Sequence, residues 1–133
     1  REALSAPIDS SAFSTWHELS RLIEQRMLDI YHEDAAARQL ILAQHGLSEV
    51  VQADRQHDME LGDLMYKLFD QHFHLPVMPL DVDVFALAME LSDRVYARSV
   101  QLHEAITPRM AEEGKRVFEA YLGLYLPPFL IKR

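Results

Sequence analysis

Apolar residues recur every three or four positions along most of this chain, a spacing typical of amphipathic helices rather than strands. The first such stretch runs from about Thr15 to Tyr31. Thr15 and Glu18 stand three residues apart at its start, the spacing of a capping box. Its recurring apolar residues are Trp16, Leu19, Ile23, Met27 and Ile30. The pattern predicts a helix with one broad apolar face.

Two further helices are predicted before the middle of the chain. Asp34 is a suitable cap for a short helix that would end at Gly46, since glycine readily adopts the left-handed conformation of a helix end. Ser48 is the expected cap of a longer helix reaching about Phe73. The stretch 74–79 holds two prolines, which remove amide donors and restrict the residues before them. We expect it to be the main loop.

The remainder of the chain predicts two more helices. Asp81 is the expected cap of a helix reaching about Ala105, and Thr107 caps a final helix that opens with Pro108 and ends before Pro127. Hairpin signals such as Asn-Gly and Asp-Gly are absent from the sequence. The expected fold is therefore all-α, a single domain over residues 1–133 built as a bundle of about five helices.

Apolar residues cover a wide arc of the last two predicted helices, wider than one partner helix would cover. Small residues such as Gly114 and Gly123 in the final helix favour close helix approach. We expect a homodimer in which the last two helices of each subunit form a four-helix bundle, although the same residues would also serve to complete a monomeric core. The predicted interface residues are Leu91, Val95, Leu102, Val117, Phe118, Tyr121, Leu122 and Tyr125.

Charge and composition narrow the possible partners. The formal net charge of −8 and the lack of clustered Lys and Arg argue against direct binding of this segment to a phosphate backbone. Cysteine is absent, which excludes disulfides and thiolate metal sites and fits a reducing cytoplasm. No apolar run approaches the ~20 residues of a membrane-spanning helix. We expect a soluble cytoplasmic protein with no membrane partner.

Several short motifs near the carboxyl end resemble the closing helices of TetR-family C-terminal domains. They are Ile106-Thr107-Pro108, Glu112-Glu113, Ala120-Tyr121-Leu122 and Tyr125-Leu126-Pro127, with the preceding helix around Phe85 to Leu91 also similar. The resemblance is best over roughly the last 50 residues. Over the first 75 residues it extends only to helix order, a short helix followed by a long one.

The resemblance implies a small-molecule-sensing and homodimerisation domain of a transcriptional repressor. In this family the last two helices pair across the twofold axis and the earlier helices enclose an inducer pocket. DNA would be bound by a helix-turn-helix unit of about 50 residues, which we expect to precede Arg1 because this chain lacks it. DNA is thus an expected partner only through that missing domain.

A pocket in such a domain would be lined by the inward faces of the first, third and fourth predicted helices. The expected ligand-binding residues are Trp16, Ile23, Met27, His57, Met65, Tyr66, Phe69, Phe85 and Met89. Methionine and aromatic side chains suit a hydrophobic or aromatic effector, since they adapt to irregular shapes and offer flat contact area. The same stripe would equally serve as plain core.

The sequence offers little sign of chemistry. Asp54, His57 and Asp58 share one predicted helix face, but the Glu-x-x-His motifs of a di-iron bundle are absent, as is a nucleophile-elbow sequence. We expect no catalytic residue, no metal site and no cofactor. Two alternatives to the sensing domain stay open: a helical oligomerisation adaptor that binds no ligand, and a metal-binding helical-bundle enzyme.

Overall fold

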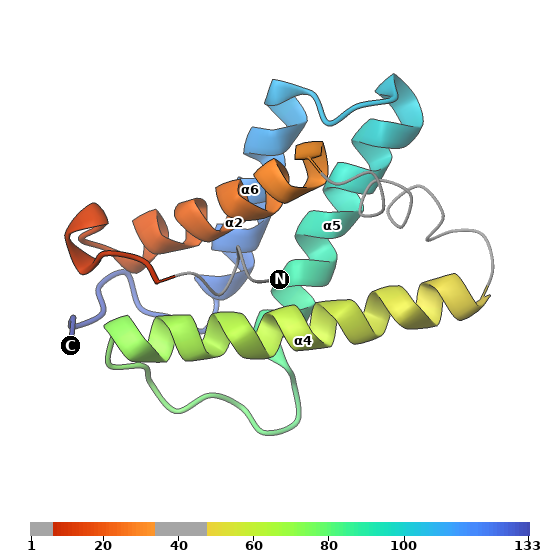
Figure 1. The fold of residues 1–133 in the computed structure, drawn as a ribbon. Helices are drawn as coiled ribbons and strands as arrows, with labels where there is room; N and C mark the ends of the chain where they lie inside the picture. The colour runs from red at the N-terminus through yellow and green to blue at the C-terminus, as the bar shows by residue number, and fades with distance from the viewer. Residues whose placement is uncertain (1–6, 34–47) are drawn as a thin grey trace.

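Four α-helices and one 3-10 turn form the regular structure of the residues that the computed structural model describes, 7–33 and 48–133, with the backbone alone over 48–59 (Figure 1). They are η1 (Ser10–Ala12), α2 (Trp16–Glu33), α4 (Ser48–His72), α5 (Val84–His103) and α6 (Pro108–Leu122). These ranges contain no strand, only an isolated bridge between Phe73 and Lys132. The all-α prediction is confirmed. The short helix expected from Asp34 lies outside the described residues, so the count of five stays a prediction.

The helices pack around α5. It lies against α6 on one side and α4 on the other, and the loop between α5 and α6 turns the chain back so that the two run antiparallel (Figure 1). Helix α2 lies mainly against α6 and meets α4 over a shorter stretch. The result is two helices, α2 and α4, laid across an antiparallel pair.

The predicted start of α2 is confirmed in detail. The Thr15 hydroxyl accepts from the Glu18 amide at 3.2 Å, and the Glu18 carboxylate accepts from the Thr15 amide at 3.2 Å. This reciprocal pair is the capping box that the spacing predicted, and it satisfies two amide donors that lack helical partners.

The boundaries of α5 differ from the prediction. Asp83, not Asp81, caps the helix, and its side chain accepts from the Ala86 amide at 3.2 Å. The helix ends at His103 rather than Ala105, because Glu104 takes a left-handed conformation with φ 59°. Both candidate caps are aspartates, so a sequence holding Asp81 and Asp83 does not itself distinguish the two starts.

The start and end of α6 follow the prediction. Thr107 accepts from the Met110 amide at 3.2 Å, Pro108 occupies the first turn, and the helix ends at Leu122, before Pro127. Ser99 of α5 joins this turn, donating to the Ala105 carbonyl at 2.8 Å and accepting from the Thr107 amide at 3.1 Å. The α5–α6 turn is therefore tied by side chains as well as by the backbone.

Large apolar side chains from all four helices fill one main core. Its fully buried members include Trp16, Leu19, Phe69, Phe73, Met89, Phe118 and Leu122. A smaller cluster of Leu28, Tyr31, Tyr96, Val100 and Ile106 lies under the α5–α6 turn. Burial of this kind is the main favourable term in folding.

The tail after α6 returns to the beginning of α2 and the end of α4. The Trp16 indole donates to the Pro127 carbonyl at 2.8 Å, and Lys132 donates to the carbonyls of Ser10 at 2.6 Å and Phe13 at 2.8 Å. The Arg133 amide donates to the His72 carbonyl at 2.9 Å. The tail thereby joins two helix ends that are far apart in the sequence.

Two buried glycines mark places of closest packing. A Cβ on Gly62 of α4 would lie 2.6 Å from the Ala86 backbone of α5, so this glycine makes room for a neighbouring helix. A Cβ on Gly114 of α6 would lie 2.1 Å from the Tyr96 ring. The buried Tyr96 ring therefore packs into the space that a side chain at Gly114 would occupy.

We predict that Gly114→Ala destabilises the protein by ~1–3 kcal/mol, because the added methyl group overpacks a filled site and outweighs alanine's better helix propensity. Urea unfolding followed by circular dichroism measures the loss. Gly123→Ala is the matched control, since its Cβ would come no nearer than 3.3 Å to another atom. Equal losses in the two variants would contradict the assigned role of Gly114.

Candidate functional site

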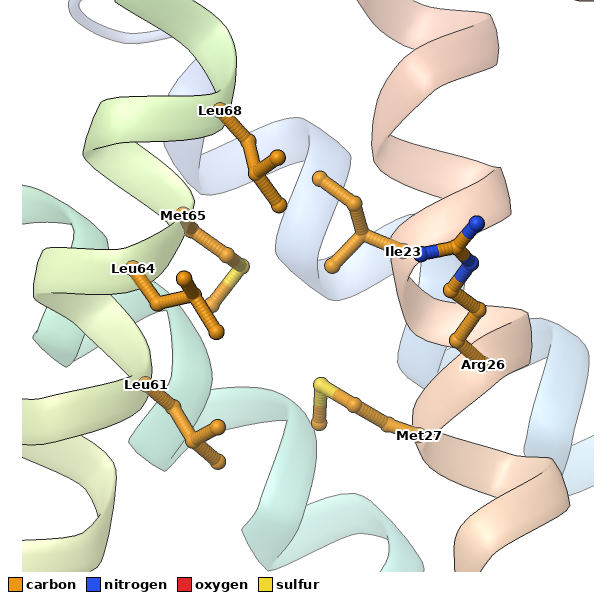
Figure 2. A pocket seen from close by; sticks show the side chains of 7 residues that line it. All are labelled: Ile23, Arg26, Met27, Leu61, Leu64, Met65 and Leu68. Atoms are coloured by element: carbon orange, nitrogen blue, oxygen red, sulfur yellow. The ribbon is translucent and has the colours of Figure 1, made fainter. Parts of the chain in front are cut away.

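A small pocket lies between α2 and α4, with a cavity volume of about 10 Å³, roughly enough for one water molecule (Figure 2). Its lining residues are Ile23, Arg26, Met27, Leu61, Leu64, Met65 and Leu68. Six of these seven side chains are apolar, and Arg26 supplies the one charged group among them. We call this site the α2–α4 pocket.

Helical spacing explains why these residues meet. The α2 positions are three and four apart, as are those of α4, so each set forms one stripe along its helix. In Figure 2 the Met27 side chain reaches toward Leu61, and Ile23 lies opposite Leu68. Arg26 lies beside Ile23 on α2 and donates to the Pro7 carbonyl at 3.4 Å.

The predicted ligand-binding residues divide into those that line this pocket and those that do not. Ile23, Met27 and Met65 line it. Tyr66 is 40% exposed and absent from the lining, and it meets Phe85 edge-on, with ring centroids 5.7 Å apart. Four others lie buried in the main core: Trp16, Phe69, Phe85 and Met89. The His57 side chain lies outside the described residues.

Four lining residues were not in the predicted set, namely Arg26, Leu61, Leu64 and Leu68. Leu61, Leu64 and Leu68 occupy the same helical stripe as Met65, so the apolar spacing itself carried the signal. The prediction favoured methionine and aromatic residues over leucine. Which stripe residues face a cavity and which face the core depends on helix packing that the sequence does not show.

The predicted dimer residues differ in exposure along α5, α6 and the following turn. Leu91, Leu102 and Tyr125 are exposed. Phe118 and Leu122 are fully buried in the chain's own main core. The remaining three, Val95, Val117 and Tyr121, are half-buried. For Phe118 and Leu122 the intrachain core accounts for their apolar character.

A buried carboxyl group lies on the side of α2 that faces α5. Glu24 is fully buried, and it accepts a hydrogen bond of 2.5 Å from the Tyr96 hydroxyl. The Ser92 hydroxyl lies 3.3 Å from the other carboxyl oxygen and 3.1 Å from the Met89 carbonyl. We call Glu24, Ser92 and Tyr96 the buried acid network.

Burial dominates the electrostatics of this network. It raises the pKa of Glu24 from 4.5 to about 7, although hydrogen bonds from Tyr96 and Ser92 and the charge of Lys115 act in the opposite direction. Burial also raises the pKa of Tyr96, and the neighbouring Glu24 raises it further. The tyrosine is therefore a neutral donor at any physiological pH.

Polar contacts at the surface fasten α2 to α6. Arg21 pairs with Glu112 at 2.8 Å and with Glu119 at 3.3 Å, and Lys115 donates to Gln25 at 2.7 Å. The hydrogen bond from Arg21 lowers the pKa of the Glu112 carboxyl. These pairs are largely solvated, so each adds little stability on its own. Helix α2 thus has one face on the pocket and another fastened to α5 and α6.

Metal-ligating side chains do not gather in the described part of the chain, where no group of three His, Asp or Glu is placed to hold an ion. His72 packs edge-on against Phe13 with ring centroids 5.0 Å apart. The side chains of Asp54 and Asp58 lie outside the described residues, like that of His57. None of the helices over residues 7–33 and 48–133 has the length and apolar character needed to cross a membrane.

Comparisons with known proteins give no relative for this arrangement. No protein-family model, curated protein or solved structure matches the chain.

We predict that Tyr96→Phe destabilises the protein by ~1–3 kcal/mol, because it leaves a buried oxygen of Glu24 without its donor. Chemical denaturation at pH 6 is the measurement. Tyr66→Phe removes a hydroxyl from a ring that is 40% exposed, and it should change stability by less than ~0.5 kcal/mol. A Tyr96 variant as stable as the Tyr66 variant would show that the hydrogen bond contributes nothing.

Proposed function

We propose that this chain is the small-molecule-sensing and homodimerisation domain of a cytoplasmic TetR-like transcriptional repressor. The observation that carries the proposal is the α2–α4 pocket, an apolar site on a helix that is also fastened to α5 and α6. A ligand that displaces α2 would act directly on the helix pair proposed to form the dimer. Such a connection between two sites is what allosteric control requires.

The lining favours a hydrophobic or aromatic effector. The cavity of about 10 Å³ is far smaller than the ~300–1,000 Å³ of typical ligand sites, so binding requires α2 and α4 to separate. Two features make separation feasible: the two helices meet over a short stretch, and Met27 and Leu64 are only half-buried. Methionine can then reshape itself around the ligand.

The proposed dimer surface consists of the exposed and half-buried apolar residues of α5, α6 and the turn after α6. Its members are Leu91, Val95, Leu102, Val117, Tyr121 and Tyr125. An isologous pairing of this surface would set the distance between two DNA-binding units, which the proposal assigns to a helix-turn-helix domain outside this chain. Effector binding would change that distance.

A helical adaptor without a ligand is the second candidate. The observation in its favour is the tight packing of Trp16, Phe69 and Met89, three predicted pocket residues that the core has enclosed. An adaptor would dimerise through the same surface, but no small molecule would stabilise it. Ligand binding therefore separates the two candidates.

We predict that at least one compound in a panel of phenols, aromatic acids and medium-chain fatty acids stabilises the domain, by ~2.7 kcal/mol at 100 times its dissociation constant. Thermal denaturation followed by calorimetry measures both quantities. Leu64→Trp should abolish the stabilisation by filling the pocket, whereas Lys67→Trp, 71% exposed at its side chain and absent from the lining, should keep it. A panel without any stabilising compound would favour the adaptor.

We predict that the chain sediments as a dimer at micromolar concentration and that Leu102→Glu weakens the dimer at least tenfold, because it places a charge in an apolar interface. Analytical ultracentrifugation gives the association constant. Leu80→Glu is the matched control, since Leu80 is fully exposed in the loop before α5 and outside the proposed surface. A monomer, or equal weakening by both variants, would refute the proposed surface.

A further inference from the structure

The buried acid network joins three helices at one point. Glu24 comes from α2, Ser92 and Tyr96 come from α5, and the Tyr96 ring rests on Gly114 of α6. No solvent reaches the Glu24 side chain. Because an ionised carboxylate is costly to bury without a neutralising partner, the charge state of Glu24 bears directly on how α2 is held.

Counting protons in the network distinguishes the two charge states. The Ser92 hydroxyl has a single proton and two nearby acceptors, the Glu24 carboxyl and the Met89 carbonyl. If Glu24 is ionised, Ser92 and Tyr96 each donate to one of its carboxyl oxygens, and the Met89 carbonyl, inside α5, keeps its helical amide donor. If Glu24 is a neutral acid, it donates to Ser92, Ser92 donates to Met89, and Tyr96 donates to the other oxygen of Glu24. Both forms therefore satisfy these groups by hydrogen bonds, and the neutral form is favoured because Glu24 is fully buried.

Within the described residues, the charged groups around the network do not supply a direct counter-ion. From α6, Lys115 attracts the Glu24 charge at a distance, but its ammonium group donates to Gln25 at 2.7 Å. Asp93 of α5 and Glu112 of α6 act on Tyr96 and are negative, and Arg21 on α2 is engaged by Glu112 and Glu119. Among the described side chains of α4, those that line the pocket facing α2 are apolar: Leu61, Leu64, Met65 and Leu68.

We propose that the contact of Glu24 with α5 depends on its protonation: it holds α2 against α5 when the carboxyl group is neutral and weakens when the carboxyl group ionises. The neutral acid completes the hydrogen-bond chain to Ser92 and Met89. In the ionised form Ser92 donates to Glu24 instead, and a negative charge is placed in the interior. This inference concerns the fold itself and does not depend on a ligand or on dimerisation.

The direction of the pH effect follows from the raised pKa of Glu24. Its folded value of about 7 lies above its ordinary value of 4.5, so between these values the folded state holds more protons than the unfolded state. The stabilising contribution is complete below pH 4.5, declines as pH rises toward 7 and is lost above it. Glu24 alone should raise the unfolding equilibrium constant on the order of 10²-fold between about pH 5 and pH 8.

The test compares urea unfolding of the whole chain and Glu24→Gln at about pH 5 and pH 8. In the variant the new side-chain amide would donate to Ser92 and its carbonyl would accept from Tyr96, so it imitates the neutral acid at every pH. Between these pH values we expect the unfolding equilibrium constant of the wild type to rise on the order of 10²-fold relative to that of Glu24→Gln. Because both proteins contain the seven histidines, their titration cancels in the comparison. Glu112→Gln, a change at a solvent-facing carboxylate, should retain the pH response of the wild type.

The proposal is overturned if the unfolding equilibrium constants of the wild type and Glu24→Gln keep the same ratio at both pH values. Glu24 would then not change its charge on folding. If Glu24→Gln fails to fold, carbon-13 NMR of the labelled wild-type carboxyl groups gives the answer directly. A Glu24 titration midpoint near 7 supports the proposal, and a midpoint near the ordinary 4.5 refutes it.

Discussion

The burial of Glu24 against Tyr96 constrains the arrangement of three of the four described helices. A carboxyl group removed from water needs its partners at fixed distances, and these come from α5. The Tyr96 ring in turn needs the space above Gly114, which fixes how closely α6 can approach α5. The position of α2 on the α5–α6 pair thus follows from polar geometry, while the apolar core around Phe118 and Leu122 supplies most of the favourable free energy.

The sequence predicted the helices well because their signals are local. The Thr15 and Glu18 capping box, the Thr107 cap and Pro108 are each set by neighbours within one turn, and all three were confirmed. The start of α5 was wrong by two residues, since Asp81 and Asp83 offer the same chemistry. Local signals of this kind do not depend on how the helices later pack.

The candidate site was predicted less well because it depends on packing between distant segments. Ile23, Met27 and Met65 line the pocket as expected, but Trp16, Phe69 and Met89, from similar stripes, lie in the core. The buried acid network gave no motif at all, since Glu24 and Tyr96 are 72 positions apart. Glu24 and Ser20 are buried among the apolar residues of α2, and the helical spacing of the apolar residues did not single them out.

The tail after α6 bears on how the α2–α4 pocket can open. Lys132 secures the residues that lead into α2, and Arg133 is bonded to the end of α4, so the tail clasps the two helices together at one end (Figure 1). These contacts hold the start of α2 and the end of α4 together, and the tail makes no such contact with the other ends of the two helices within the described residues. Under the proposed function, a ligand that separates α2 and α4 would therefore part them most at the Met27 and Leu61 end, away from the tail, and least at the Leu68 end.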